Sequence, residues 1–462
     1  MTLRPDTYVS IGAVLKTLKQ NIKIRPQIEQ ISVFESYGRV LAEDIKSPIN
    51  VPLYDSSHMD GFAVLADDIR HASNLTPITL NVVGDTTLGR FSNHTLRSGQ
   101  AYRISTGGYL PRGSNAVIPI EYTSESKGKV EILASFGKRS HISPSGENIL
   151  RNSLLFNQGK ILRGQDVALL SLVGINKTHV YQKPKVAIIP TGDELTDNLK
   201  EVKYGKILDT NSHFISKLVL EAGGSAIDLG ISPDDISRIK KKITSALDKA
   251  DLILTIAGSS VGKYDFVKRS INSLGKPGVL AHGVKLDRGR VTGIGTLRGK
   301  PIIMLPGPIQ GAINAFITFT RPLLEYLLGL PESDGLVIKG TLMEKWQARK
   351  RFRDFTKIVY VFAWKTKAGI IRAFPIIGDT ADLTVLTRAN GYLVLPENKT
   401  AIAAGEKVQI HILPGLSYPS GCSADFLSDS SLIKKRIISM SRPSYGRETK
   451  NKKRQWSNRF LA

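Results

Sequence analysis

Two adjacent acidic residues, Asp193 and Glu194, could take part in catalysis or bind a metal ion, because they follow an apolar run. Thr191, Gly192, Asp193 and Glu194 come directly after the run 185–190. Carboxylates placed after a tight turn suit a Mg²⁺ ion held directly or through water. Taken alone, Thr-Gly-Asp-Glu is as often an ordinary turn, so this segment needs support from the rest of the chain.

Two further segments suit the binding of an anion. Residues 257–265 are rich in small residues, which let backbone N–H groups approach a phosphate, and they end on Asp265, which can take a metal ion or a hydroxyl. Residues 305–311 lead into a predicted helix, whose N-terminus attracts anions. Together with the first segment, the positions that we expect to contact the ligand are Thr191, Gly192, Asp193, Gly258, Ser259, Ser260, Gly262, Pro306, Gly307 and Pro308. The plainer alternatives are a short connection and an ordinary helix entry.

A fourth polar cluster opens a β-rich region. Residues 55–60 hold two acids, two hydroxyls and one histidine, and the turn at 103–108 is similar. The alternative is an Asx-type turn with Gly61 in the left-handed conformation. His58 has no second histidine at metal-ligand spacing, so we predict no zinc site.

The elements predicted around the first three segments form an alternating series. Strands are predicted at 185–190, 226–229, 251–256 and 300–305, and helices at 209–221, 237–250, 264–274 and 310–328. Such alternation is typical of a parallel, three-layer α/β domain, in which ligands bind beyond the carboxyl ends of the strands. All three segments then fall on one edge of the sheet. This coincidence is stronger evidence for a ligand-binding site than any single segment.

Other parts of the chain follow different patterns. Ile11, Val14, Leu15 and Leu18 share one face of a helix predicted over 8–22. A second helix is predicted over 164–174. Residues 50–140 and 335–413 alternate short apolar runs with turn residues, which indicates β structure.

Length and composition set the class of protein. A chain of 462 residues predicts about three domains, with four within range. Its single cysteine, Cys422, excludes an intramolecular disulfide and a zinc site built on paired cysteines, and fits a reducing, cytoplasmic compartment. We find no apolar run near the length of about 18 residues that a membrane span requires. The N-terminus also lacks the pattern of a secretory signal.

The net charge of +24 is unevenly distributed. Residues 431–462 hold ten Lys and Arg side chains against one acid, Glu448, which leaves +15 for the rest of the chain. The tail is predicted to be a solvated, disordered extension, with a weak anionic partner such as nucleic acid as the alternative. The charge of the body is consistent with an anionic small-molecule substrate.

The motifs, in this order, resemble the molybdopterin molybdenumtransferases (MoeA-like proteins) over about residues 8–414. The matching segments are Ser-x-Met-Asp-Gly-Phe-Ala-Val at 57–64, Arg-Ile-x-Thr-Gly at 103–107, Pro-x-Gly-x-x-Ala-Val at 111–117, Thr-Gly-Asp-Glu-Leu at 191–195, Asp-Thr-Asn at 209–211, Ser-Val-Gly-x-x-Asp at 260–265 and Leu-Pro-Gly at 305–307.

The resemblance implies a multidomain α/β plus β fold. The implied parts are an elongated mixed α/β domain (1–50 and 141–177), an inserted β domain (51–140), a three-layer α/β molybdopterin-binding-like domain (178–330), a C-terminal β-barrel domain (331–414) and a basic tail (415–462). It also implies a homodimer, with each active site between the α/β domain of one subunit and the inserted β domain of the other.

The resemblance further implies the reaction. The enzyme would insert molybdate, or tungstate, into adenylylated molybdopterin and release AMP, with Mg²⁺ as the cofactor. Asp60 and Thr106 would face the pterin or metal side, and Glu194 and Asp265 would be catalytic acids. The implied Mg²⁺ ligands are Glu194, Asp265 and one acid of the pair Asp234 and Asp235, with Asp235 preferred.

Departures from the family pattern lie in the loops that handle anions. The usual Gly-Gly-x-Ser reads Ala-Gly-Ser-Ser at 257–260, Lys-Pro-Gly-Lys-Pro reads Asp-Arg-Gly-Arg-Val at 287–291, Pro-Gly-Asn-Pro reads Pro-Gly-Pro-Ile at 306–309, and Gly-Glu-Asp reads Gly-Glu-Asn at 146–148. Arg288 and Arg290 keep positive charge, so we expect both to bind substrate, although an arginine fork differs from a lysine point charge.

The departures make the chain a divergent paralogue. One alternative function is therefore a non-catalytic protein that binds or carries molybdopterin. A nucleic-acid-binding or scaffold protein that uses the basic tail is a third possibility.

Overall fold

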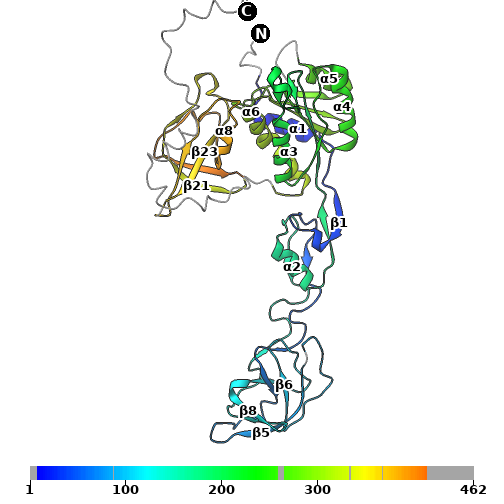
Figure 1. Ribbon diagram of the computed structural model, residues 1–462, viewed down its shortest axis with the longest axis vertical. Coiled ribbons are helices and arrows are strands. Elements are labelled where there is room, and N and C mark those ends of the chain that lie inside the picture. Colours follow the sequence, from blue (N-terminus) through cyan, green and yellow to red (C-terminus); the bar gives the residue numbers. More distant parts are fainter. Residues whose placement is uncertain (1–7, 87, 259–264, 332–334, 367, 414–462) are drawn as a thin grey trace, which may run out of the picture. The chain divides into compact units, whose positions relative to one another are not determined.

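The computed structural model describes residues 8–86, 88–258, 265–331, 335–366 and 368–413 (Figure 1). The chain divides into two compact units, residues 28–181 and residues 1–27 with 182–462. None of the helices within the described ranges is long and apolar enough to cross a membrane.

The α/β domain of the second unit has a six-stranded sheet. Its strands, in spatial order, are β16 (Ser225–Asp228), β13 (Lys185–Pro190), β17 (Leu252–Ile256), β20 (Lys300–Leu305), β19 (Gly293–Leu297) and β18 (Gly278–His282). The first four are parallel and agree with the predicted strands. The last two are antiparallel and were not predicted, so the sheet is mixed.

Helices cover both faces of this sheet, which gives the predicted three layers (Figure 1). Val186 and Ile188 of β13 pack on one face, and Ala187 and Ile189 on the other. The first face is covered by α3 (Asn211–Glu221) and α6 (Ile309–Ala315), and the second by α4 (Ile236–Lys249) and α5 (Phe266–Leu274). The long helix predicted over 310–328 is α6, a π-helical turn at Phe316–Thr320 and α7 (Arg321–Leu327).

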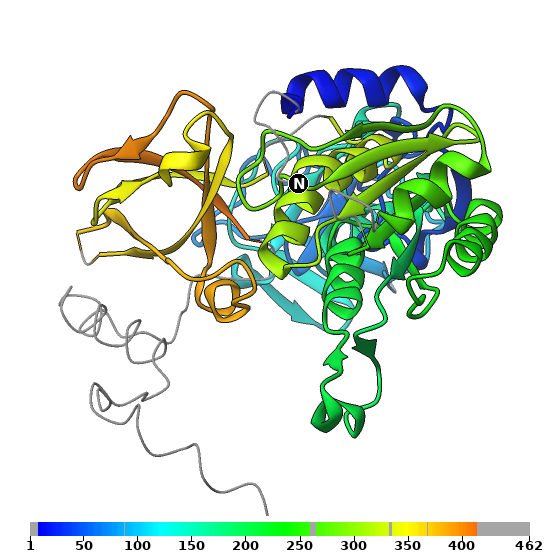
Figure 2. The ribbon, with the colours of Figure 1, turned by 90° about the horizontal axis from the view of Figure 1, so that it is seen from above.

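The N-terminal helix also packs on the α/β domain. Ser10 caps α1 (Ile11–Asn21), the dark blue helix in Figure 2. Val14 and Leu18 enter the same apolar core as Val186. The family resemblance implies that this helix belongs to the mixed domain 1–50, whereas it packs on the α/β sheet and belongs to the unit that contains that sheet. The apolar stripe was visible in the sequence, but a stripe does not specify which sheet it will cover.

The C-terminal β region is a closed five-stranded barrel, as predicted. Its strands in order are β21 (Val337–Leu342), β24 (Ile371–Pro375), β23 (Lys357–Lys365), β25 (Gly391–Leu395) and β27 (Lys407–Ile412). The short helix α8 (Thr384–Arg388) lies between β24 and β25 in the chain. A short pair, β22 (Trp346–Gln347) with β26 (Ala401–Ile402), accompanies the barrel.

The first unit contains the inserted β domain and the mixed domain. The β domain has a six-stranded sheet in the order β7 (Ala116–Pro119), β4 (Gly61–Val64), β6 (Gln100–Ile104), β5 (Ile78–Asp85), β9 (Lys129–Ile132) and β8 (Thr123–Ser126). The mixed domain joins β1 (Ile28–Ser32) to β12 (Lys177–Tyr181), β2 (Ile45–Lys46) to β11 (Leu154–Phe156), and carries α2 (Gly164–Leu172). A third short pair is β3 (Ser56–Ser57) with β10 (Ile142–Ser143).

The remaining short elements lie in connections. They are β14 (Leu195–Thr196) paired with β15 (Ile207–Leu208), and single 3₁₀ turns at Val33–Glu35, Ile120–Tyr122, Glu201–Tyr204 and Lys350–Phe352.

Candidate functional site

The three candidate segments of the α/β domain leave neighbouring strands at one edge. The strands β13, β17 and β20 are adjacent and parallel, so their carboxyl ends point the same way. The backbone continues this alignment past the strands, since Thr191 N donates to Ile256 O (2.9 Å) and Ala257 N donates to Leu305 O (3.0 Å). The predicted coincidence of the three segments is confirmed.

Gly192 lies in close contact with the Glu194 carboxylate. A Cβ at residue 192 would lie 2.5 Å from Glu194 Oε2, so the exposed carboxylate would have to move if residue 192 carried a side chain. Gly192 N also donates to Ser232 O (3.0 Å), which ties the turn to the segment that follows β16. The turn after β13 therefore places Glu194 at the edge of the sheet.

Three acids gather beside this turn. Asp234 N donates to Asp193 Oδ1 (3.1 Å). Burial raises the pKa of Asp234, and the charges of Glu194 and Asp193 raise it further. A cation bound here would relieve that repulsion.

The three predicted metal ligands do not meet as a group. Asp235 caps α4, with Oδ1 accepting from Arg238 N (2.8 Å), so its neighbour Asp234 is the acid beside Glu194. Within the described residues no three His, Cys, Asp or Glu side chains are arranged to hold a metal ion. A cation would thus depend on few protein ligands.

Asp265 is buried and fully engaged. Its Oδ1 accepts from Lys268 N (3.0 Å) at the start of α5, and its Oδ2 lies 3.1 Å from His282 Nδ1. Burial raises the pKa of Asp265, although the Lys268 amide and the charge of His282 lower it. His282 could not be inferred from the sequence, because strand β18 was not predicted.

The second segment begins with two left-handed residues. Ala257 and Gly258 have φ angles of 66° and 63°. A Cβ at residue 258 would lie 2.2 Å from Thr191 Oγ1, so a glycine is needed where the first two segments meet. The predicted contacts Ser259, Ser260 and Gly262 lie outside the described residues.

The third segment packs against the second. A Cβ at Gly307 would lie 3.3 Å from the Cβ of Ala257, and Gly307 O accepts from Asn211 Nδ2 (2.6 Å). Pro306 and Pro308 flank it, and Pro308 precedes α6 without a side-chain cap. Gln310 N at the start of α6 donates to Thr380 O (3.1 Å) of the barrel, so part of the helix terminus is already used.

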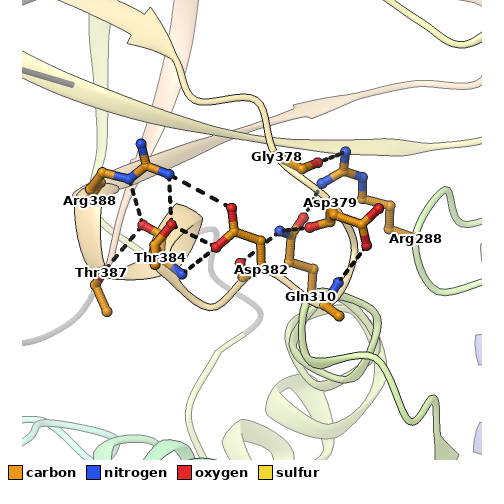
Figure 3. Close-up of polar contacts among 9 residues, drawn as sticks. Arg288, Gln310, Gly378, Asp379, Asp382, Thr384, Thr387 and Arg388 are labelled. Atoms are coloured by element: carbon orange, nitrogen blue, oxygen red, sulfur yellow. Dashed lines mark hydrogen bonds and ion pairs between the residues drawn. The ribbon is translucent and has the colours of Figure 1, made fainter. Parts of the chain in front are cut away.

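Arg288 is a bridge between the α/β domain and the barrel (Figure 3). Its Nη1 donates to Gln310 Oε1, and its Nη2 donates to Gly378 O (2.6 Å). Burial and the charge of Arg349 lower its pKa. In this arrangement the guanidinium contacts protein groups at both ends, so the predicted substrate contact would require it to rearrange.

Arg290 belongs to a cluster that the sequence analysis did not single out. Its guanidinium lies 5.1 Å from the centroid of Phe352, and those of Arg349 and Arg351 lie 4.8 Å and 5.7 Å from it. Arg349 also pairs with Asp287. Arg290 is far from Arg349 and Arg351 in the chain. They meet because the segment 349–353 approaches the loop 287–291.

In the other unit, Asp60 and Thr106 meet directly. Asp60 precedes β4 and Thr106 follows β6, and the antiparallel register pairs Gly61 with Ile104. Asp60 Oδ1 accepts from Thr106 N (2.7 Å) and Thr106 Oγ1 (3.0 Å), and both residues are exposed. The Thr106 amide, and next its hydroxyl, lower the pKa of Asp60.

Position 61 requires glycine for a reason other than the left-handed Asx-type turn that the sequence suggested. It lies in β4, and its φ is not positive. A Cβ there would lie 1.9 Å from Ile118 O of β7, so the close approach of the two strands requires glycine.

Comparisons with known proteins agree with this organisation. Three family profiles match, described as "MoeA N-terminal region (domain I and II)" over residues 9–174, "Probable molybdopterin binding domain" over 187–326 and "MoeA C-terminal region (domain IV)" over 339–413.

Two relatives cover most of the chain. A protein named molybdopterin molybdenumtransferase 2 from Mycobacterium tuberculosis is 30% identical over 386 residues, which are 82% of this chain and 94% of the relative. A molybdopterin molybdenumtransferase from Staphylococcus epidermidis is 29% identical over 419 residues, which are 90% of this chain and 99% of the relative.

A solved structure has the same fold. The molybdopterin biosynthesis MoeA protein from Pyrococcus horikoshii superimposes with a TM-score of 0.78 at 32% identity, and covers 89% of this chain and all of that one.

Proposed function

The chain belongs to the family of molybdopterin molybdenumtransferases, and we propose that it inserts molybdate or tungstate into adenylylated molybdopterin with release of AMP. It is a transferase of molybdenum cofactor biosynthesis. The observation that carries the proposal is the shared edge of β13, β17 and β20, where Glu194 stands beside glycine-rich turns.

The residues of this edge are suited to an adenylate. The turns at Gly192 and Gly258 are closely packed, since a Cβ at either residue would meet Glu194 or Thr191, and they lie at the carboxyl ends of parallel strands, where ligands bind in open α/β sheets. Glu194 and Asp234 would position a water molecule and a cation near the bond that breaks. Asp265, with both oxygens engaged, would orient the loop rather than bind the phosphate.

A Mg²⁺ ion fits two of these acids. Mg²⁺ is commonly held by one or two carboxylates together with substrate phosphates and water. Glu194 and Asp234 would supply the carboxylates, since their mutual repulsion favours a cation between them. When bound, the ion would neutralise charge on the phosphate oxygens.

We further propose that the functional unit is a homodimer in which Asp60 of one subunit serves the site of Glu194 in the other. Asp60 and Thr106 are exposed and leave Asp60 Oδ2 able to contact a ligand. Glu194 lies in the other compact unit of the chain.

Mixing two inactive variants tests both proposals. Asp60→Asn and Glu194→Gln are expected to abolish AMP release and maturation of an apo-molybdoenzyme when each is assayed alone. A random mixture of the two, refolded or co-expressed, contains heterodimers with one intact site, so activity should return to about one quarter of wild type. Mixed protein that stays inactive contradicts the shared site, and wild-type protein that neither releases AMP nor matures the enzyme contradicts the function.

A carrier that binds molybdopterin without turnover is the second candidate. It is favoured by Arg288, which stands where the family pattern has a lysine and whose guanidinium is already bonded to Gln310 and Gly378. Tight pterin binding without AMP release, measured on the same wild-type protein, would select this alternative.

A further inference from the structure

Three aromatic rings form an exposed cluster in the inserted β domain. Tyr54 meets Phe91 edge to face (centroids 4.5 Å apart) and Tyr109 edge to face (5.5 Å), and Phe91 and Tyr109 are stacked (4.8 Å, 10° between planes). Tyr54 is 47% exposed and Phe91 is 56% exposed. Single exposed aromatics need no explanation, but three in mutual contact form a rigid apolar platform.

The platform is built on the same two segments as the Asp60–Thr106 pair. Gly107 N donates to Ser57 O (2.8 Å), Ser57 N donates to Gly108 O (2.9 Å) and Leu110 N donates to Asp55 O (3.0 Å). Tyr54 and Tyr109 therefore stand at one end of this pairing, and Asp60 and Thr106 at the other. The three residues from Thr106 to Tyr109 span at most about 10 Å, which is about the length of a fused pterin system.

We propose that Tyr54, Phe91 and Tyr109 are the stacking surface for the pterin ring of the substrate and that Asp60 accepts hydrogen bonds from the edge of that ring. The inference rests on the proposed function for the presence of a pterin. Flat heteroaromatic rings stack on aromatic side chains with little regard to their substituents, so the platform supplies affinity.

The Asp60 carboxylate supplies the preference for a pterin. The aminopyrimidinone edge of a pterin presents adjacent N–H donors, and one carboxylate oxygen has two lone pairs with which to accept from both. Both Thr106 bonds go to Asp60 Oδ1, so Oδ2 can accept from a ligand, and its lowered pKa keeps the group ionised. Adenine presents no such pair of donors, and the adenylate end is therefore assigned to the α/β domain.

Fluorescence titration of the full-length protein with 6-carboxypterin, and separately with AMP, tests the subsite. Phe91→Leu keeps an apolar side chain but removes the ring, and is expected to weaken pterin binding about tenfold. Phe91→Tyr restores the ring and should restore the affinity. Asp60→Asn should weaken pterin binding as well, while AMP binding is unchanged in all three variants.

Phe34→Leu is the matched control, because Phe34 is 77% exposed in the same unit but lies outside the platform. Equal pterin affinity in Phe91→Leu and Phe34→Leu would overturn the proposal, as would wild-type protein that binds no pterin. Loss of AMP binding with Phe91→Leu would assign the platform to adenine and overturn it too. A changed oligomeric state with unchanged pterin affinity, measured by sedimentation, would make the platform a subunit contact.

Maturation of an apo-molybdoenzyme separates this inference from the proposed function. If wild-type protein matures the enzyme and Phe91→Leu binds pterin normally, the subsite is wrong and the function stands. If wild-type protein fails to mature the enzyme, the function fails, and the pterin titration still decides whether the platform is a pterin site.

Discussion

Asp60 owes its properties to its neighbour rather than to burial. It is exposed, and two hydrogen bonds from Thr106 lower its pKa. Both residues were identified through the family resemblance, because the segments 57–64 and 103–107 match motifs of the family. Asp234 was left as one of two choices, since the sequence does not tell which of two adjacent acids caps a helix and which faces Glu194.

Removing the Thr106 hydroxyl should alter the acid limb of the pH–activity profile. In Thr106→Ala the backbone amide still donates to Asp60, so the pKa of Asp60 rises only part of the way to its ordinary value. A group with a depressed pKa acts as a carboxylate at all pH values above that pKa, so activity should be lost at a higher pH in the variant than in wild type. We expect kcat/KM near neutral pH to fall about tenfold through poorer positioning, which corresponds to about 1.4 kcal/mol.

Thr106→Ser is the control, because it keeps a hydroxyl at the same place. It should leave the acid limb close to that of wild type. An acid limb that is the same in Thr106→Ala and wild type would show that Asp60 does not depend on this contact.

The elements of the α/β domain were predictable where apolar residues dominate. The strand 185–190 is buried on both faces, and such strands read as continuous apolar runs. The hairpin of β18 and β19 was not predicted, because glycine-rich segments are more typical of loops than of strands. They are needed for close approach, since a Cβ at Gly295 would lie 2.8 Å from Gly278 O and one at Gly293 would lie 1.7 Å from Met304 Cε.

The start of α2 depends on one carboxylate whose effect on stability varies with pH. Asp166 Oδ2 accepts from Arg163 N (2.9 Å) and Nε (3.1 Å) and lies 3.4 Å from Lys160 Nζ. The Arg163 side chain, more than the other contacts, lowers the pKa of Asp166 to about 2. Because the folded pKa lies below the unfolded one, the stabilisation is present above about pH 4 and is lost as the pH falls through about 2.

Asp166→Asn should therefore reduce local stability at pH 7 by about 1 kcal/mol, the usual effect of losing a helix-capping carboxylate. Hydrogen exchange of the α2 amides, corrected for intrinsic rates, measures this loss, and the difference from wild type should shrink toward pH 2. Asp67→Asn is the control, because Asp67 makes only exposed ion pairs with Arg70 and Lys138. Equal protection of α2 in wild type and Asp166→Asn would contradict the assignment.

The α/β domain and the barrel are joined through α6, and this junction was not foreseen from the sequence. Asn314 Nδ2 donates to Arg288 O (3.2 Å), and Asn314 Oδ1 accepts from Tyr360 OH (2.8 Å) of the barrel. Burial raises the pKa of Tyr360, so the hydroxyl remains a donor. Sequence patterns predicted both domains, because each has its own apolar periodicity. The polar contacts between them join positions with no shared periodicity, which only the folded chain brings together.

Gln310 is the centre of this junction, and its removal should uncouple the two domains. Its fully buried side chain accepts from Arg288 Nη1 and donates from Nε2 to Asp379 O (2.5 Å) and Asp382 O (3.1 Å) (Figure 3). Gln310→Ala removes these hydrogen bonds to partners that are only partly buried or exposed, at a cost of about 1 kcal/mol for each bond lost. We expect calorimetry of the full-length variant to show the barrel melting separately and earlier than the α/β domain.

Gln347→Ala is the control, because Gln347 is an exposed glutamine in β22, and this variant should melt as wild type does. A single unshifted transition in Gln310→Ala would mean that apolar packing alone couples the two domains.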